Sequence, residues 1–204
     1  MKGLYAITDP YLTPGEALFE AVQAALDGGT RMLQYRDKLH EAGDRLRIAQ
    51  RLRELTAAHR ALLIINDDIA LAAAVEADGV HLGKEDASLE AAREKLGDDA
   101  LIGISCYADL ARARQAAQAG ASYVAFGRVF PSRTKPHATP APLSLITRAK
   151  TELDVPVVAI GGITLENIDR VVTAGADMAA VIHGLFGQND IRAAAEAFCA
   201  AFKS

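Results

Sequence analysis

An amide and two cations alternate along residues 34–38, Gln-Tyr-Arg-Asp-Lys. Side chains of an extended chain point alternately to its two sides, so we expect Gln34, Arg36 and Lys38 to face the same way. The arginine guanidinium is a planar fork of donors and the lysine ammonium is a compact charge, and together they suit a diphosphate. The segment therefore predicts a diphosphate-binding array. A solvated basic turn, paired with Asp37, is the alternative for this segment taken alone.

Carboxylates follow two short apolar runs in the next part of the chain. Asp67 comes shortly after residues 62–65, Leu-Leu-Ile-Ile, and Asp86 comes shortly after residues 79–82, Gly-Val-His-Leu. In proteins Mg²⁺ takes one or two carboxylates and completes its shell with phosphate oxygens and water. We therefore expect Asp67 and Asp86 to share one Mg²⁺ with a phosphorylated ligand. As an alternative, Asp67 or its neighbour Asp68 caps the helix that follows.

Hydroxyls, a lysine and a pair of glycines mark further places where phosphate could bind. Ser132, Thr134 and Lys135 lie in the long, Pro-rich stretch 131–142, which is a candidate lid over the site. The glycine pair 161–162 follows an apolar run, and glycines let the backbone approach a ligand closely. These residue types predict contacts with phosphate oxygens. A purely structural turn is the alternative at the two glycines.

The remaining candidates carry weaker signals. His81 has apolar neighbours on both sides, so we expect a packing role for it. Ser105 has no nearby His or acidic motif to make it a nucleophile, and we expect it to hydrogen-bond a ligand instead. Cys106 and Cys199 are the only two cysteines, and their wide separation argues against a disulfide or a zinc site.

Short apolar runs alternate with Ala/Leu-rich stretches of helical period, which is typical of repeated βα units on a parallel sheet. We expect eight strands, at residues 3–8, 31–35, 62–65, 79–82, 101–105, 123–127, 157–160 and 178–182. Small residues recur just before every second strand, which favours closure. The prediction is an α/β fold in which residues 1–204 form a single (β/α)8 TIM barrel domain, with an open doubly wound sheet as the alternative. In such a barrel the polar residues after the strands gather on one face.

The first helix carries explicit start and stop signals. Residues 13–16, Thr-Pro-Gly-Glu, predict a start at which Thr13 caps the helix and Glu16 bonds back, and Gly28 predicts its end. Leu18 and Val22 recur at helical spacing and predict a face buried in the core.

Composition limits the partners of the chain. Half of the 204 residues are hydrophobic and the net charge is −4, so there is no bulk attraction for nucleic acid or anionic lipid. The sequence contains no run of about 18 uninterrupted apolar residues, and its N-terminus does not resemble a secretory signal. We expect a cytoplasmic protein without nucleic-acid or membrane partners, and a homo-oligomer stays open.

Read in order, five segments resemble the thiamine phosphate synthase family, across nearly the whole chain. They are residues 34–38, 66–67, 78–86, 132–135 and 159–163. The resemblance implies a transferase of thiamine biosynthesis on a (β/α)8 barrel. Such an enzyme joins hydroxymethylpyrimidine diphosphate to a thiazole phosphate with Mg²⁺, releasing diphosphate and forming thiamine phosphate.

Carried over position by position, the resemblance also implies roles for individual residues. The residues that would bind Mg²⁺ are Asp67 and Asp86. Those that would bind the diphosphate are Gln34, Arg36, Lys38, Asn66 and Lys135. Ser105 would contact the pyrimidine. Those that would hold the thiazole phosphate are Ser132, Thr134, Gly162, Ile182 and His183. The implied catalytic residues are Lys135, Ser105 and Arg36.

Two positions depart from the family pattern. Ser132 stands where threonine is usual and keeps the hydroxyl, whereas His183 stands where serine is usual and changes both size and possible charge. In the implied mechanism, cationic groups neutralise the departing diphosphate, the aminopyrimidine stabilises a carbocation, and the thiazole nitrogen attacks it. No protein nucleophile is needed.

Two other functions compete with this one. A related thiazole tautomerase would bind the thiazole alone, and its needs would explain neither Asp86 nor the basic array at 34–38. A non-catalytic sensor of phosphorylated ligands would tolerate the same phosphate-binding groups.

Overall fold

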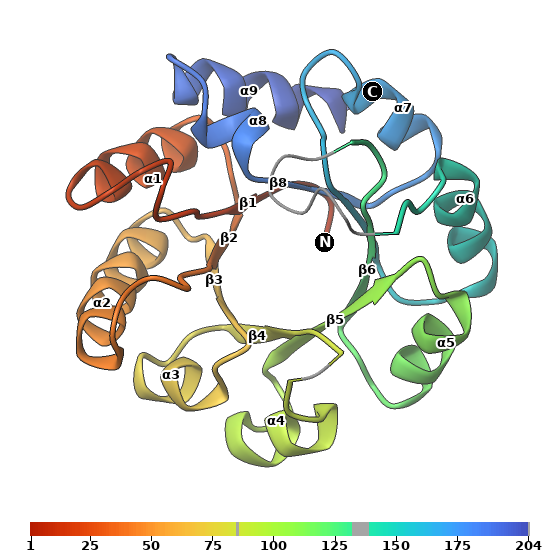
Figure 1. Ribbon diagram of the computed structural model, residues 1–204, viewed down its shortest axis with the longest axis horizontal. Helices are drawn as coiled ribbons and strands as arrows, with labels where there is room; N and C mark the ends of the chain where they lie inside the picture. Colours follow the sequence, from red (N-terminus) through yellow and green to blue (C-terminus); the bar gives the residue numbers. More distant parts are fainter. Residues whose placement is uncertain (85, 132–138, 204) are drawn as a thin grey trace.

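The computed structural model describes residues 1–84, 86–131 and 139–203. Eight parallel strands pair in sequence order and close into a barrel, with β8 returning to β1 (Figure 1). The strands are β1 (Gly3–Ile7), β2 (Met32–Tyr35), β3 (Leu62–Asn66), β4 (Gly79–Leu82), β5 (Leu101–Tyr107), β6 (Tyr123–Gly127), β7 (Val157–Ile160) and β8 (Met178–Val181). The predicted (β/α)8 barrel is confirmed, and every predicted strand lies within two residues of an observed one.

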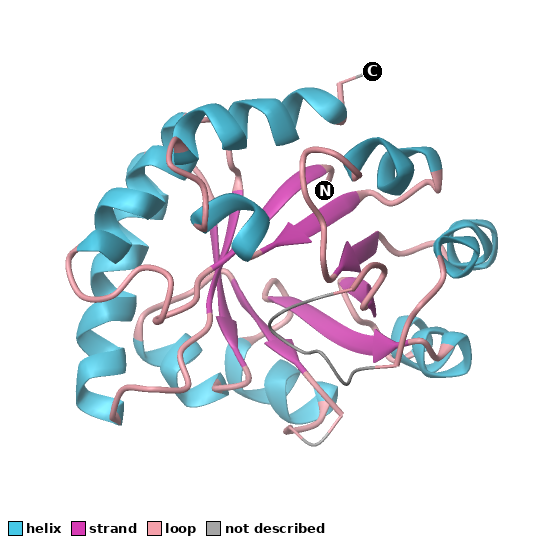
Figure 2. Cartoon of the chain, turned by 45° about the horizontal axis from the view of Figure 1, so that its top comes forward, coloured by secondary structure: helices cyan, strands magenta, loops and turns pink. Residues whose placement is uncertain are grey.

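Helices surround the barrel on its outer side, as Figures 1 and 2 show from two directions. They are α1 (Ala17–Asp27), α2 (Ala42–Ala58), α3 (Ile69–Ala74), α4 (Leu89–Leu96), α5 (Leu110–Gln118), α6 (Leu143–Glu152), α7 (Ile168–Thr173), α8 (His183–Phe186) and α9 (Ile191–Ala201). The short α8 follows β8 directly and lies closer to the barrel axis than α9 does (Figure 1). In the described part of the chain, no helix is long and apolar enough to cross a membrane.

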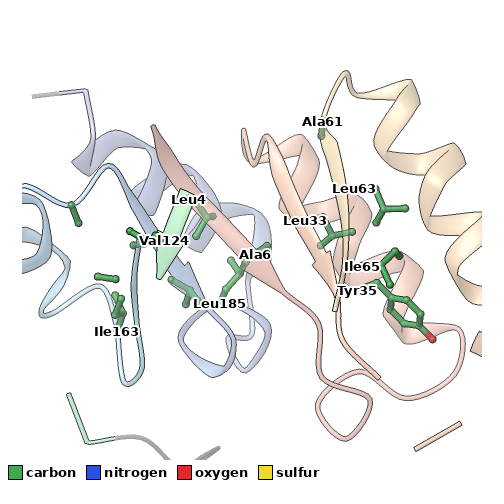
Figure 3. Packing of buried hydrophobic residues seen from close by; sticks show 14 of the residues in the cluster. Leu4, Ala6, Leu33, Tyr35, Ala61, Leu63, Ile65, Val124, Ile163 and Leu185 are labelled. Atoms are coloured by element: carbon green, nitrogen blue, oxygen red, sulfur yellow. The ribbon is translucent and has the colours of Figure 1, made fainter. Parts of the chain in front are cut away.

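The strands divide the core into two layers because their side chains alternate in direction. One buried cluster contains only strand residues, among them Tyr5, Met32 and Ile64, and fills the barrel interior. The larger cluster joins the intervening strand residues to the helices; Figure 3 shows Leu33 and Leu63 in this outer layer. Inward-pointing positions therefore alternate with outward-pointing ones up to the strand ends, where the site begins.

The start of α1 differs from its prediction. The helix begins at Ala17 after Glu16, and no side chain caps it. The Thr13 hydroxyl instead donates to the Asp9 carbonyl at 3.3 Å, within a turn that precedes the helix. The capping prediction was wrong because this turn uses the hydroxyl. The predicted end at Gly28 is confirmed.

Asp68 takes the capping role that the sequence left open between it and Asp67. Its carboxylate accepts a hydrogen bond of 2.9 Å from the Leu71 amide at the first turn of α3. Asp67 instead has a positive φ of 63°, which turns this residue away from the helix start. Of the two neighbouring aspartates, Asp68 therefore caps α3 and Asp67 does not.

Candidate active site

A cavity of about 450 Å³ opens at the carboxyl ends of the strands. Residues at or just beyond the ends of all eight strands contribute to its wall. The predicted site residues that line it are Gln34, Arg36, Asn66, Ser105, Gly162, Ile182 and His183. Lys38 meets Asp67 beside this wall, and Asp67 in turn reaches Asp86. The predictions for Ser132, Thr134 and Lys135 concern positions outside the described residues.

A continuous chain of polar side chains crosses the floor of the cavity. The Gln34 side-chain amide donates to the Tyr5 hydroxyl at 2.7 Å, and the hydroxyls of Tyr5 and Tyr123 share a hydrogen bond of 2.8 Å. The chain continues from the Tyr123 hydroxyl to His81 Nδ1 at 3.1 Å, and from His81 Nε2 to the Ser105 hydroxyl at 2.9 Å. Inward-pointing residues of β2, β1, β6, β4 and β5 are thereby joined.

The sequence did not reveal this network. His81 was expected to pack against apolar neighbours, but its ring hydrogen-bonds on both sides and stacks on the Tyr123 ring with centroids 5.6 Å apart. The sequence around Ser105 contains no histidine, but the fold brings His81 into hydrogen-bond contact with its hydroxyl. One sequence signal could have pointed to this network. The alternation of side chains along their strands places Tyr5 and Tyr123 inside the barrel, where their hydroxyls need hydrogen-bond partners.

The two tyrosines in the floor of the cavity are polar but uncharged. Burial raises the pKa of Tyr5 and of Tyr123 well above that of an exposed phenol, so both stay protonated at neutral pH. Gly103 makes room for this arrangement, because a Cβ atom there would collide with the Tyr123 ring. A floor of neutral donors and acceptors suits a flat heteroaromatic ring that carries its own hydrogen-bonding groups.

Two carboxylates meet at the ends of β3 and β4. Asp67 Oδ2 accepts hydrogen bonds of 2.6 Å from Lys38 Nζ and of 2.6 Å from the Asn66 amide, and Asp67 and Asp86 lie within hydrogen-bond reach of each other. Partial shielding from water raises the pKa of Asp86, although the residue is exposed, and the Asp67 carboxylate raises it further. Burial would also raise the pKa of Asp67, but the Lys38 ammonium and the hydrogen bonds with Asp86 and Asn66 together outweigh burial and lower that pKa. Holding two like charges together favours binding of a cation between them.

This pair fits Mg²⁺ better than it fits a metal held only by protein. Among the described residues, no three or more His, Cys, Asp or Glu side chains form a group that could hold a metal ion. Asp67 and Asp86 therefore offer two hard oxygen ligands and leave the rest of a coordination shell to water and phosphate oxygens, which is the usual arrangement for Mg²⁺ with a phosphorylated substrate. Lys38 lies at the same edge, where its ammonium contacts Asp67.

Asp37 organises the loop that presents Arg36 and Lys38. Its buried carboxylate accepts hydrogen bonds from the Leu39 amide at 2.8 Å, the His40 amide at 3.0 Å and the Tyr35 hydroxyl at 2.8 Å, and it pairs with the His40 ring at 2.7 Å. Burial alone would raise the pKa of Asp37, but these hydrogen bonds lower it below its ordinary value. Asp37, which the sequence offered as a counter-ion for Arg36 and Lys38, therefore stabilises the loop that carries them.

On the opposite side of the cavity, the ends of β7 and β8 present glycines among mainly small and apolar residues. Gly162 has a φ of +66°, and a Cβ atom there would collide with the Pro131 carbonyl oxygen and the Phe130 side chain. The side-chain nitrogen of Asn167 donates to the Gly162 carbonyl at 3.0 Å, and the side-chain oxygen of Asn167 accepts from the backbone amide of Thr164 at 2.9 Å. The turn after β7 is therefore held by hydrogen bonds and packs closely against the segment that follows β6.

Comparisons with known proteins agree with this geometry. A family model described as thiamine monophosphate synthase matches residues 4–185. The thiamine-phosphate synthase of Chromobacterium violaceum is 55% identical over 99% of this chain and 97% of its own length. That of Nitrosococcus oceani is 53% identical over 100% of this chain and 94% of its own length.

A solved structure shows the same likeness in three dimensions. Thiamine phosphate pyrophosphorylase from Pyrococcus furiosus superposes with a TM-score of 0.90, at 37% sequence identity, over 98% of this chain and 95% of its own. The likeness in sequence and in fold spans the strand ends that form the cavity. The chain belongs to the thiamine monophosphate synthase family, and it is a transferase of thiamine biosynthesis.

Proposed function

We propose that the cavity at the strand ends binds both hydroxymethylpyrimidine diphosphate and a thiazole phosphate, side by side, and that Mg²⁺ assists departure of the diphosphate. The observation that carries this proposal is the continuity of the cavity, which joins Arg36 at one side to the Gly162 turn at the other across a polar floor. Its volume of about 450 Å³ lies within the usual range of small-molecule sites.

The pyrimidine is proposed to lie on the floor. Gln34, His81 and Ser105 present hydrogen-bonding atoms there, and Tyr5 and Tyr123 fix the Gln34 amide and the His81 ring from below. A ring held in this way keeps its reacting carbon at one place in the cavity, which lowers the entropic part of the barrier. Ser105 contacts substrate in this arrangement and acts as a hydrogen-bonding residue.

The diphosphate is proposed to lie at the ends of β2, β3 and β4. Arg36 supplies a planar fork, Lys38 a compact charge and Asn66 an amide donor for phosphate oxygens. Mg²⁺, when bound by Asp67 and Asp86, would neutralise charge that develops on the departing diphosphate. The protein residues hold the leaving group in place, and no side chain has to form a covalent bond with the substrate.

The thiazole phosphate is proposed to lie at the ends of β7 and β8. Gly162 and the Ile182–His183 segment line that part of the cavity. Glycine leaves the backbone accessible to phosphate oxygens, so this contact does not require a charged side chain. The thiazole nitrogen then faces the pyrimidine carbon from the side opposite the diphosphate.

We further propose that the chain acts in the cytoplasm as one catalytic domain. The net charge of −4 gives no attraction for anionic membrane surfaces, which supports this location, and the family model that matches residues 4–185 supports a single catalytic domain.

The deciding experiment measures diphosphate release by the purified protein. Both substrates are supplied, with Mg²⁺ or with a chelator, and each substrate is also tested alone. We expect release only with both substrates and the metal, and recovery when Mg²⁺ is restored. Chelator-insensitive conversion of the thiazole alone would contradict the proposal in favour of a tautomerase, and binding without turnover would favour a sensor.

A further inference from the structure

Arg112, on α5, joins β5 to the loop after β4, and it does not belong to the cavity wall. Its Nε donates to the Ser105 carbonyl at 2.8 Å, and its Nη2 donates to the Gly83 carbonyl at 3.1 Å. Ser105 belongs to β5, whereas Gly83 begins the loop after β4. One partly buried guanidinium therefore connects the serine on the cavity floor to the segment that carries Asp86.

The Gly83 backbone in turn determines where the Asp86 carboxylate lies. The Gly83 amide donates to Asp86 Oδ2 at 2.5 Å, so the carboxylate closes back over the start of its own loop. A Cβ atom at position 83 would lie 2.6 Å from that oxygen, so a larger residue there would displace the Asp86 carboxylate. Any shift of the Gly83 peptide therefore moves a carboxylate proposed to bind the metal.

An irregularity in β5 provides a second support for the same loop. The register with β6 shifts between Ser105 and Tyr107, and Tyr107 takes a positive φ of 54°. The Tyr107 hydroxyl accepts a hydrogen bond of 3.3 Å from the Lys84 amide. The bulge thus directs one side chain at the loop after β4, while Arg112 holds the carbonyl groups of both segments.

We infer that Arg112 is a positioning residue for the metal site: by bonding the Gly83 and Ser105 carbonyls together, it sets the position of Asp86 relative to the pyrimidine floor. The inference rests on the proposed function. Arginine suits this role because its fixed fork reaches two carbonyl groups on different elements, whereas the single ammonium of lysine is a flexible point donor. Residues that orient metal ligands in this way typically contribute about 10–100-fold to metal affinity.

The test compares Arg112→Lys with Arg114→Lys. Arg114 lies on the same helix, and its ion pair with Glu152 is at the exposed surface, so it is a matched control. Binding of Mn²⁺, with inorganic diphosphate present, is measured by electron paramagnetic resonance, and the Mg²⁺ concentration for half-maximal diphosphate release is measured separately. We expect Arg112→Lys to weaken Mn²⁺ binding and raise that concentration by about tenfold, with kcat largely restored at saturating Mg²⁺. Arg114→Lys should change neither.

A second variant guards against a simple loss of folding. Tyr107→Phe removes the hydroxyl that supports Lys84 but leaves Arg112 intact, and it should shift the Mg²⁺ requirement in the same direction by a smaller factor. If Arg112→Lys lowers only the melting temperature, or if Arg112→Lys fails to fold and Tyr107→Phe leaves the Mg²⁺ requirement unchanged, the inference is wrong. If the wild-type protein itself binds no Mn²⁺ with diphosphate, the proposed metal site fails, and the inference fails with it.

Discussion

At the ends of β2, β3 and β4 charged side chains gather at or beside the cavity, whereas at the ends of β7 and β8 its wall consists of glycines and mainly apolar residues. Lys38 and Asp67 form an ion pair of 2.6 Å on the first side. On the second side, the Gly162 turn is held by Asn167 through two hydrogen bonds. Both sides are proposed to receive phosphate, yet they are built from different groups.

The difference follows from the charge that each side must handle. A departing diphosphate accumulates negative charge, so cations and a metal near it stabilise the transition state. The phosphate of the thiazole keeps its charge throughout the reaction and needs only to be held, which favours fixed backbone donors. Substitutions on the first side should therefore act through charge, and those on the second side through backbone shape.

Asp86→Asn should have the largest effect. It removes one of the two carboxylates proposed to hold Mg²⁺, and we expect diphosphate release to fall about 1000-fold at saturating substrates, since metal stabilisation is worth several kcal/mol. The exposed position of Asp86 predicts a nearly unchanged melting temperature. Asp68→Asn is the control, because asparagine also caps helices well and Asp68 caps α3. A collapse of folding in Asp86→Asn would make that residue structural.

Gly162→Ala should come next and act on the other substrate. The added methyl group collides with the chain leaving β6, and the resulting displacement is expected to lower kcat/KM for the thiazole phosphate about 100-fold. Binding of the pyrimidine diphosphate, measured by calorimetry, should stay near the wild-type value.

Gly97→Ala separates collision from backbone strain in this comparison. Gly97 also has a positive φ, of 87°, but nothing lies within 4 Å of its added Cβ atom. It should cost stability without changing either substrate's kinetics. Equal losses for both substrates in Gly162→Ala would show that this turn supports the whole cavity, not its thiazole end alone.

Arg36→Lys should have a smaller effect, confined to the pyrimidine diphosphate. The charge is kept but the planar fork is lost, and we expect binding to weaken about tenfold. Arg47→Lys, on the exposed surface of α2, is the control. Unchanged affinity for the pyrimidine diphosphate would remove Arg36 from the diphosphate site.

These substitutions also separate what local sequence can predict from what it cannot. The strands, and the inward direction of Gln34, follow from short apolar runs and from the period of two, which are properties of neighbouring residues. The approach of Asp67 to Asp86 could be anticipated because parallel strands end on one face. A glycine pair after a strand likewise marks a backbone site.

Contacts across the barrel could not be predicted in this way. Tyr5 and Tyr123 are 118 residues apart, and their hydrogen bond depends on the register of every strand between them. The bracing role of Arg112 depends in addition on a bulge in β5, for which the sequence gives no clear signal. At Thr13 a strong local pattern misled the prediction. The residue was expected to cap α1, but its hydroxyl is used in the turn that precedes the helix.

Asp37→Asn should change stability and its pH dependence more than catalysis. The lowered pKa of the folded state means that the Asp37 carboxylate stabilises the protein fully above the ordinary aspartate pKa of about 3.9. This stabilisation is lost as the pH falls through the lowered pKa. At neutral pH the variant should lose about 1–3 kcal/mol of unfolding free energy, measured with urea. The difference in unfolding free energy between the wild-type protein and the variant should disappear in acid. A difference that stays constant across pH would exclude the Asp37 charge as its cause.

His183→Ser should have the smallest effect, although His183 is the clearest departure from the family pattern. A Cβ atom added at Gly187 would lie 3.0 Å from two atoms of the His183 ring, so the ring packs along α8 itself. If the phosphate is held by backbone here, kcat/KM for the thiazole phosphate should change less than about fivefold, the net worth of one hydrogen bond. His59→Ser, remote from the cavity, is the control. A loss near that of Arg36→Lys would mean that the imidazole binds phosphate directly, and that both sides of the cavity rely on side-chain charge.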